Sequence, residues 1–399
     1  MKTLENVPVF TEDPYSESAL LDPYPFLERL AAAGPVSYLE ATGIYAITGY
    51  EEVYEVLKDF ETYVSSGGLG PRDIRKDEGW RPPSILESDP PIHTLMRRAL
   101  TGVINPGTVR KLREPFTPPA AELVSELAHR THFDAIKDLA ELYPIRVFPD
   151  AVGIPEGGRE HLLPYGNMVF NAFGPENYIY EQAFAHADEH SAVVMKACEH
   201  ESLSPGGFGA KIWERVEDGL ITEQQATLLV RALLSAGVDT TIFGIGNVLS
   251  VLAGEPEAWQ ELRKQPHLAK FAIDEALRLE SPFQKFHRTV STDTTLGGVD
   301  LPAGTKVLVF LGAANRDPEK WGSDATKFSL DRTSSGHVAF GMGLHQCVGQ
   351  PIARLEMEIV LQQMLEHVET ISLAGEPQPI LHNVLRGFES LPVEISAAK

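Results

Sequence analysis

A glycine-rich loop with a cysteine near its end constrains this chain more than any other stretch. The loop is Phe340–Gly349, with the sequence FGMGLHQCVG, and the apolar periodic run Ile352–Leu365 follows it at once. That periodicity predicts a helix directly after the loop. Glycine lets the backbone approach a flat ligand closely. The loop therefore predicts a thiolate at Cys347, held where backbone N–H groups and the helix dipole lower its pKa.

Two other interpretations of the loop are weaker. A glycine-rich loop before a helix is also typical of phosphate binding, but here no Lys-Ser or Lys-Thr pair follows the glycines. A lone cysteine is most often packed in the core as a small apolar side chain. The full pattern F-G-x-G-x-H-x-C-x-G favours a ligand-binding cysteine over both.

A long apolar segment in the middle of the chain predicts a helix through the core. Thr222–Gln225 is a capping-box start and Glu255-Pro256 is a stop, with about thirty helical residues between them. Its centre, Ala236–Thr241, reads AGVDTT. Glycine costs about 1 kcal/mol inside a helix, and Asp and Thr are also poor helix formers. Two interpretations stay open here: a structural kink, or a functional site.

The other segments predict a mainly α-helical protein with a minor β region. Helices dominate from His93 to about Asp274, with interruptions expected at Pro115 and Pro118-Pro119. Before His93, a short helix is expected at 24–33, a hairpin at 36–39 with 44–48, and another helix at 51–58. Short strands are expected later, at 286–291, 306–311 and 371–395. Residues 65–84 form a long Gly- and Pro-rich loop. Without any linker composition, residues 1–399 are expected to form a single domain.

Charge and composition exclude several classes of partner. The chain has 34 basic and 56 acidic residues, a formal charge of −22, which argues against binding to nucleic acid or to an anionic membrane. The N-terminus has no apolar signal core, and no uncharged window is long enough to span a membrane. Cys198 and Cys347 are the two cysteines, so no disulfide framework is expected. These features predict a cytoplasmic protein.

Together the motifs resemble those of the cytochrome P-450 haem-thiolate monooxygenases. The matching features run in family order from Asp89 to Gly349 and cover nearly the whole chain. The resemblance implies the cytochrome P-450 fold, with haem b between the long central helix and the helix after the Cys loop. It implies that Cys347 ligates the iron, with His345 as a less favoured alternative. Phe340, Gly341 and Gly349 are implied to contact the haem.

The same resemblance assigns roles to polar residues elsewhere. In the AGVDTT segment it implies that Thr240 donates a hydrogen bond to the distal oxygen and that Asp239 helps to deliver protons. The pair Glu275 and Arg278, with Arg332 downstream, resembles the family's buried structural triad. Alone, such an i, i+3 pair would be a surface ion pair of little energetic value. Four residues are implied to bind the haem propionates: His93, Arg97, Arg288 and His345.

A narrower resemblance is to bacterial members that oxidise para-substituted benzoates. It rests on segments 80–84, 169–175, 233–237 and 385–393. One position departs, because Ala232 is a serine in relatives of that type. The implied reaction is O-demethylation or hydroxylation of a small aromatic acid such as para-methoxybenzoate. Six residues are expected to contact the substrate: Arg81, Ser84, Phe170, Phe173, Ser235 and Phe286.

Electrons are expected to come from NAD(P)H through a ferredoxin reductase and a ferredoxin, as in the soluble members without a fused reductase domain. Basic residues at Arg97-Arg98 and at Arg110, Lys111 and Arg113 are expected to face the ferredoxin. Other functions remain as alternatives. These are oxidation of a methoxyphenol, terpene or fatty acid, a peroxide-driven reaction, and a haem sensor or electron carrier without oxygen chemistry. The last is disfavoured because such a protein needs no proton relay at Asp239 and Thr240.

Overall fold

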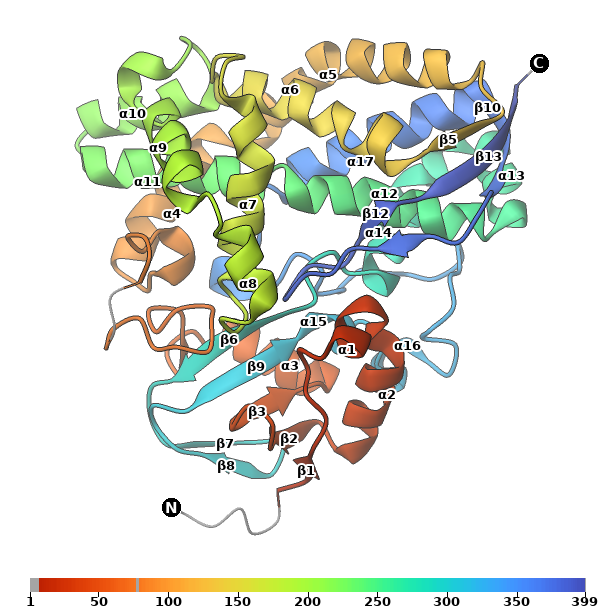
Figure 1. Ribbon diagram of the computed structural model, residues 1–399. Coiled ribbons are helices and arrows are strands. Elements are labelled where there is room, and N and C mark those ends of the chain that lie inside the picture. Colours follow the sequence, from red (N-terminus) through yellow and green to blue (C-terminus); the bar gives the residue numbers. More distant parts are fainter. Residues whose placement is uncertain (1–6, 77–78, 399) are drawn as a thin grey trace.

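The computed structural model describes residues 7–76 and 79–398. It has the predicted architecture, a large helical part beside a smaller β part (Figure 1). The helices are α1 (Glu17–Leu21), α2 (Pro23–Ala33), α3 (Tyr50–Lys58), α4 (Ile92–Val103), α5 (Pro106–Leu127), α6 (Leu142–Val152), α7 (Leu162–Asn171), α8 (Tyr178–Ala183), α9 (Ala187–Ala197), α10 (Phe208–Glu217), α11 (Glu223–Ala236), α12 (Asp239–Ala253), α13 (Pro256–Lys264), α14 (Ala269–Leu279), α15 (Leu311–Ala314), α16 (Pro318–Trp321) and α17 (Gln350–His367).

The largest sheet has six strands in the order β1-β2-β3-β9-β6-β4. Its strands are β1 (Val9–Phe10), β2 (Val36–Leu39), β3 (Ile44–Ile47), β4 (Tyr63–Val64), β6 (Lys285–Val290) and β9 (Lys306–Phe310). The predicted hairpin is present as the antiparallel pair β2–β3, and β9 joins β3 in parallel. A three-stranded sheet, β10-β13-β5, brings the tail to the helical part through β10 (Val368–Leu373), β13 (Pro392–Ala397) and β5 (His132–Asp134). Two-stranded ribbons complete the β region: β7 (Thr294–Leu296) with β8 (Val299–Leu301), and β11 (Gln378–Pro379) with β12 (Phe388–Ser390).

The long central helix forms as α11 followed by α12. The Thr222 hydroxyl accepts a hydrogen bond from the Gln225 amide, and the Gln225 side chain accepts one from the Thr222 amide, which confirms the capping box. Over Glu223–Ala253 the segment is long and apolar enough to cross a membrane, but 78% of its apolar window is buried inside the protein. It is therefore a core helix.

One expectation about the helical part is wrong. Helix α5 continues through Pro115, Pro118 and Pro119 instead of being interrupted there. A proline inside a helix removes one backbone hydrogen bond and costs about 3 kcal/mol. Packing of the α5 face that carries Phe116, Ala120 and Val124, all buried, against α17 compensates for this cost. Tertiary packing thus overrides the local propensity.

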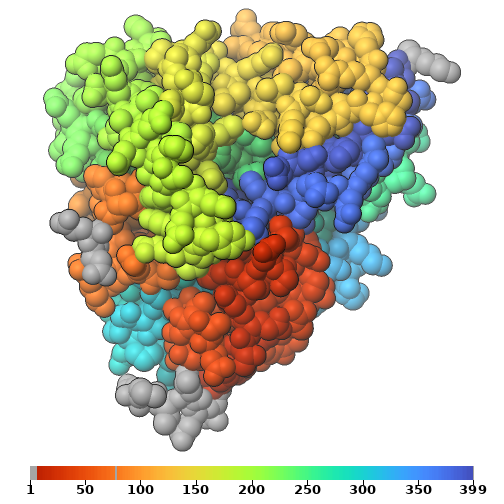
Figure 2. Space-filling model, viewed as in Figure 1, coloured from red at the N-terminus to blue at the C-terminus, as the bar shows by residue number. Residues whose placement is uncertain are grey.

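Two groups of buried apolar residues hold the elements together. The larger core extends through most of the helices and one face of the large sheet. The smaller lies between α1, α2 and the other face of that sheet, around Leu30, Leu39 and Phe310. Figure 2 shows this N-terminal segment, in red, directly against the blue C-terminal segment. A hydrogen bond of 2.9 Å from the Arg386 guanidinium to the Leu21 carbonyl joins the two.

Candidate functional site

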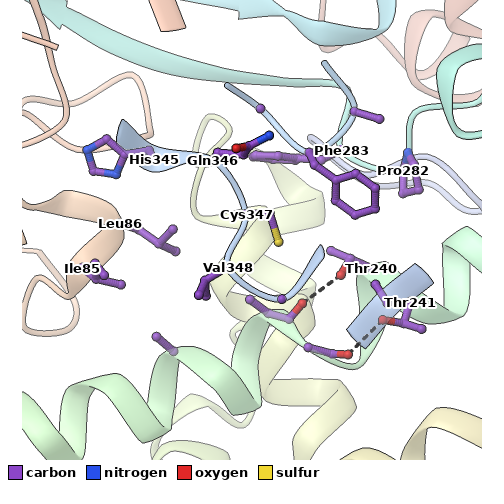
Figure 3. Close-up of a pocket in the computed structure, with 18 of the residues that line it drawn as sticks. Ile85, Leu86, Thr240, Thr241, Pro282, Phe283, His345, Gln346, Cys347 and Val348 are labelled. Atoms are coloured by element: carbon purple, nitrogen blue, oxygen red, sulfur yellow. Dashed lines mark hydrogen bonds between the residues drawn. The ribbon is translucent and has the colours of Figure 1, made fainter. Parts of the chain in front are cut away.

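The cysteine loop is held in one conformation at the end of a cavity. Gly341 and Gly343 have φ of +66° and +70°, a left-handed backbone that favours glycine. A Cβ at Gly343 would lie 2.6 Å from the Leu57 carbonyl oxygen, so only glycine fits there. The Cys347 amide donates to the Phe340 carbonyl at 2.9 Å. Figure 3 shows the sulfur of Cys347 directed into the cavity, between Gln346 and Val348.

The electrostatics of Cys347 differ from the sequence-based expectation. N–H groups of Gly349 and Gln350 do act on the sulfur, and the Arg97 and Arg354 guanidiniums add to their effect. All four lower the pKa of the thiol. Burial has the opposite and larger effect, so the pKa of Cys347 is raised from its ordinary value. The Cys347 side chain is exposed to the cavity, so a cation bound there would favour the thiolate.

All four predicted propionate-binding residues line the same cavity. The rings of His93 and His345 lie 4.2 Å apart, and His345 Nε2 is 3.0 Å from the Ser65 hydroxyl. Neither ring nitrogen of His93 has a hydrogen-bond partner among the described residues. Burial, with nearby arginines, lowers the pKa of His93 to about 4 and that of His345 to about 2. Burial also lowers the pKa of Arg288 to about 10. A buried group of donors without a carboxylate among the cavity-lining residues at this edge fits an anionic ligand.

These observations test whether the cavity suits haem. Apolar side chains form most of its wall, a cysteine sulfur faces it, and cationic donors gather at one edge. The orphaned nitrogens of His93 are an independent sign of a missing acceptor. The residues present therefore fit an amphipathic ring with an iron centre and two propionates. Cys347 would hold the iron, and His93, Arg97, Arg288 and His345 the propionates.

The central helix is interrupted where the AGVDTT segment lies. The Gly237 amide bonds to the Leu233 carbonyl at 2.9 Å and the Thr241 amide to the Val238 carbonyl at 3.0 Å, so α11 ends and α12 begins between them. The Thr240 hydroxyl donates to the Ala236 carbonyl at 2.8 Å, and the Thr241 hydroxyl to the Gly237 carbonyl at 3.1 Å. Both hydroxyls line the cavity in Figure 3.

Asp239 lies outside the cavity wall, unlike Thr240. Its side chain packs against α7, where a Cβ on Gly166 would lie 2.1 Å from Asp239 Oδ2. It is 7% exposed. Burial, with the nearby negative charge of Glu141, raises the pKa of Asp239 well above its ordinary value. Asp239 is thus placed to hold a proton behind the helix rather than beside a ligand.

The structure joins the three members of the predicted triad. Glu275 receives two hydrogen bonds of 2.8 Å from Arg278, and its Oε1 is 3.0 Å from Arg332 Nε. Both Glu275 and Arg278 are fully buried. The Arg278 guanidinium also donates at 2.6 Å to the carbonyls of Asn315 and Ala325, in the stretch before the Cys loop. This geometry connects helix α14 to that stretch.

The predicted aromatic residues gather on one side of the cavity, together with one that sequence reasoning missed. Phe170, Phe173 and Phe286 line it, and so does Phe283. The Phe283 and Phe286 rings are stacked at 5.5 Å, and Phe170 meets Phe283 edge-on at 5.7 Å. In the sequence, Phe283 lies three residues before Phe286 and directly after Pro282.

The predicted polar contacts to substrate lie behind the wall rather than in it. Arg81 Nη2 is 2.7 Å from Glu87 Oε1, and the Ser84 amide and hydroxyl donate to Glu87 Oε2 at 2.9 and 3.0 Å. The Ser235 hydroxyl donates to the Ala232 carbonyl at 3.4 Å. Their neighbours Ile85, Leu86, Ala232 and Ala236 are the ones that line the cavity.

Sequence reasoning also missed Arg231. It is 1% exposed and donates to the Pro82 carbonyl at 2.8 Å. Burial and the positive charge of Arg81 lower its pKa to about 10. Although burial opposes it, the Arg81 guanidinium and the Ser84 hydrogen bonds keep the pKa of Glu87 below its ordinary value. The cluster of Arg81, Arg231 and Glu87 therefore has two buried cations and one carboxylate.

Comparison with known proteins gives consistent results. Residues 210–396 match the family model for cytochrome P450. The protein "Cytochrome p450 CYP199A2" of Rhodopseudomonas palustris is 47% identical over 394 residues, covering 98% of this chain and 95% of that one. "Cytochrome P450 107B1" of Saccharopolyspora erythraea is 33% identical, over 88% of this chain and 89% of its own. Cytochrome P450 CYP109Q5 from Chondromyces apiculatus superposes with a TM-score of 0.82 at 26% identity, over 98% of this chain and 99% of its own.

Proposed function

The chain belongs to the cytochrome P450 family, and on this premise we propose that it oxidises a small aromatic acid such as para-methoxybenzoate. Membership makes it a cytochrome P450 monooxygenase with haem b, supplied with electrons by external redox partners. When bound, the haem supplies the activation of dioxygen. The residues of this chain have to bind the aromatic acid, orient it, exclude water and move protons.

The excess of buried positive charge beside the cavity carries the proposal. Arg81 and Arg231 lie together with the single carboxylate of Glu87, directly behind wall residues Ile85, Leu86 and Ala232. A buried charge without a counterion is costly, so this cluster favours one further anion. A substrate carboxylate supplies it. Because the cluster lies behind the wall, this attraction acts across the wall side chains, and about 1.4 kcal/mol of it corresponds to tenfold in affinity.

The aromatic side chains support a flat substrate. Phe170, Phe173, Phe283 and Phe286 surround one side of the cavity with stacked and edge-on contacts. Such pairs bind an aromatic ring with defined geometry. With the carboxylate held against the wall at Ile85, Leu86 and Ala232, in front of the buried cations, the para substituent points across the cavity. Oxidation of a para-methoxy methyl group then releases formaldehyde, which explains selectivity for the para position without a side chain on the reacting carbon.

A neutral aromatic substrate, such as a methoxyphenol, is the second candidate. One observation favours a neutral substrate: Glu87 already accepts hydrogen bonds from both Arg81 and Ser84. The two candidates differ in the charge that binding requires. Titration of the ferric protein with para-methoxybenzoate, its methyl ester and its meta isomer separates them. We expect the para acid to give the tightest binding and the largest change in the haem absorption spectrum. Equal binding of the ester would contradict an acidic substrate.

The redox partner is proposed to be an acidic ferredoxin, reduced from NAD(P)H through a ferredoxin reductase. Three cations are exposed near this part of the cavity: Arg98 on α4, the helix that also carries Arg97, and Arg110 and Lys111 on α5. Arg97 itself is directed inward to the Gln346 carbonyl, and Arg113 pairs with Glu358. The docking surface is therefore reduced to the three exposed cations. Electron transfer that weakens with added salt and with Arg98→Glu supports this surface.

A further inference from the structure

A small second cavity lies where the N-terminal helices meet the C-terminal segment. Side chains of α1 and α2, of β6 and β9, and of residues 382–386 line it. Its volume is about 20 Å³, which is room for one water molecule or one monatomic anion. Side chains alternate along a strand, so Phe286 of β6 lines the large cavity while the adjacent Lys285 lines the small one. The small cavity therefore belongs to the opposite face of β6.

Lys285 brings a buried ammonium group to this cavity. Its Nζ donates to the Pro14 carbonyl, which uses one of its three donors among the described residues. The same Nζ lies 4.4 Å from the centre of the Tyr15 ring and 5.7 Å from that of Phe310. Burial lowers the pKa of Lys285 to about 7, although the negative charge of Asp13 opposes this change. A closer anion would favour the charged form of the lysine.

His382 brings a second donor. Its Nδ1 accepts hydrogen bonds from the amides of Val384 and Leu385, at 3.1 and 3.0 Å, so the proton of the neutral ring is on Nε2. The residue is 2% exposed, and Nε2 has no hydrogen-bond partner among residues 7–76 and 79–398. The charge of Lys285 acts on the pKa of His382, so the two side chains are near neighbours. A buried N–H group thus lines the cavity without an acceptor.

Arg386 adds a third donor. Its Nε has no hydrogen-bond partner in the described part of the chain, although Glu280 Oε2 lies 3.5 Å away as an ion-pair partner. None of the described residues that line the cavity carries a carboxylate. A water molecule would bring two hydrogens that also need acceptors, whereas a monatomic anion only accepts. Three donors on the lining residues therefore favour an anion over a water molecule.

We propose that the small cavity binds one monatomic anion of the chloride class, held by Lys285, His382 and Arg386. The anion accepts the hydrogen bonds that these three side chains do not make within the protein, and it gives the buried ammonium a counterion. Phosphate, sulfate and carboxylates exceed a volume of about 20 Å³. The site is separate from the large cavity, so it does not depend on the identity of the aromatic substrate.

The proposed site joins segments that are far apart in sequence. Phe283 forms a β-bridge with Leu385, and the Gln284 amide donates to the Val384 carbonyl at 2.9 Å. Gln284 lines the small cavity and Phe283 the large one, so the site lies directly behind a wall residue. A bound anion would stabilise α2, β6 and residues 382–386 against one another. Stability should therefore depend on chloride.

The test uses the holoenzyme in two halide experiments. Crystals grown in sodium bromide are examined by anomalous diffraction, which distinguishes bromide from water. Thermal unfolding is compared in sodium chloride and in sodium gluconate at equal concentration, because gluconate is too large for the cavity. Lys285→Met removes the ammonium. Lys306→Met is the matched control, since Lys306 is also buried, on the neighbouring strand β9, but donates to the carbonyls of Gly67 and Gly68 at 2.7 and 2.9 Å.

We expect an anomalous bromide peak at hydrogen-bond distance from Lys285 Nζ and His382 Nε2. Chloride at about a hundredfold excess over its dissociation constant should raise the unfolding temperature of the wild type by about 3 °C. Lys306→Met should keep this rise and Lys285→Met should lose it. If Lys285→Met does not fold, His382→Asn, which removes the Nε2 donor, takes its place. A cavity without a bromide peak, or a chloride effect that survives loss of the donor, overturns the proposal.

Discussion

Arg81 and Glu87 form a buried ion pair, with 2.7 Å between Nη2 and Oε1, directly behind the cavity wall. In this pair the Glu87 carboxylate itself occupies the position against the Arg81 guanidinium where an anion would bind best. The charges of Arg81 and Glu87 both act on the pKa of Arg231, so Arg231 belongs to the same cluster. It is the cation of the cluster that has no carboxylate of its own. For the proposed acidic substrate, we therefore expect recognition to depend on Arg231 more than on the loop residues.

Replacing Arg231 should separate acid binding from ring binding. Arg231→Met keeps much of the buried volume but removes the charge that acts across the wall, so affinity for para-methoxybenzoate should fall about tenfold. Affinity for the methyl ester should stay within about threefold, since its contacts are apolar. Spectral titration measures both. Arg215→Met, at a partly exposed arginine on α10 paired with Asp218, is the control and should leave both affinities unchanged.

Cys347 is expected to be indispensable for thiolate ligation. Cys347→Ala should abolish the red-shifted Soret band of the reduced carbon monoxide complex, since the sulfur at the cavity wall is lost. Cys198 is fully buried at the C-terminal end of α9, and burial raises the pKa of its thiol to about 12. Cys198→Ala should therefore retain the band. A red-shifted band in Cys347→Ala would show that another residue supplies the ligand.

Thr240 and Asp239 should give different defects. Thr240→Ala removes a hydroxyl from the cavity wall and should divert electrons to peroxide while substrate binding is kept. Asp239→Asn acts from behind the helix, so it should slow turnover with less loss of coupling. Product, peroxide and NAD(P)H consumption are measured together. Wild-type rates and coupling in both variants would contradict the assigned proton path.

Stability should decrease in acid because buried histidines are held neutral. Burial lowers the pKa of His382 to about 3, with a further effect of Lys285, whereas an unfolded histidine titrates near 6.5. The unfolded state thus binds the extra proton between these values, so stability is present above pH 6.5 and is lost as pH falls toward 3.

The check is chemical unfolding at several pH values for wild type and His382→Asn. His382 Nδ1 accepts the amides of Val384 and Leu385, and an asparagine oxygen can accept similar bonds without titrating. The variant should reduce the slope by up to about 1.4 kcal/mol per pH unit. An identical slope in wild type and variant would show that His382 does not contribute.

The sequence predicted the site best where spacing alone decides geometry. The capping box at Thr222 and the Glu275–Arg278 hydrogen bonds involve residues close in sequence, and both form; the helix predicted directly after the Cys loop is α17. Their partners far along the chain, such as Arg332, were inferred from the family resemblance. The strand β5, which pairs with the tail, gave no comparable local signal.

What could not be predicted depends on tertiary packing. The sign of the pKa change at Cys347 follows from burial, which sequence does not report. The Asp239 side chain points toward α7 because Gly166 leaves room for it there. Arg81 is unavailable to a substrate because it is already paired with Glu87. In each case the residue type was identified, but the competing contact was set by an element distant in sequence.

O-demethylation of a para-methoxy aromatic acid is the reaction that we propose for this protein. The most direct test is turnover of para-methoxybenzoate by the holoenzyme with ferredoxin, its reductase and NAD(P)H. We expect equal amounts of formaldehyde and para-hydroxybenzoate, closely matched to the NAD(P)H consumed, and little product from the meta isomer. Consumption of NAD(P)H that gives peroxide but no formaldehyde, or equal oxidation of both isomers, would contradict it.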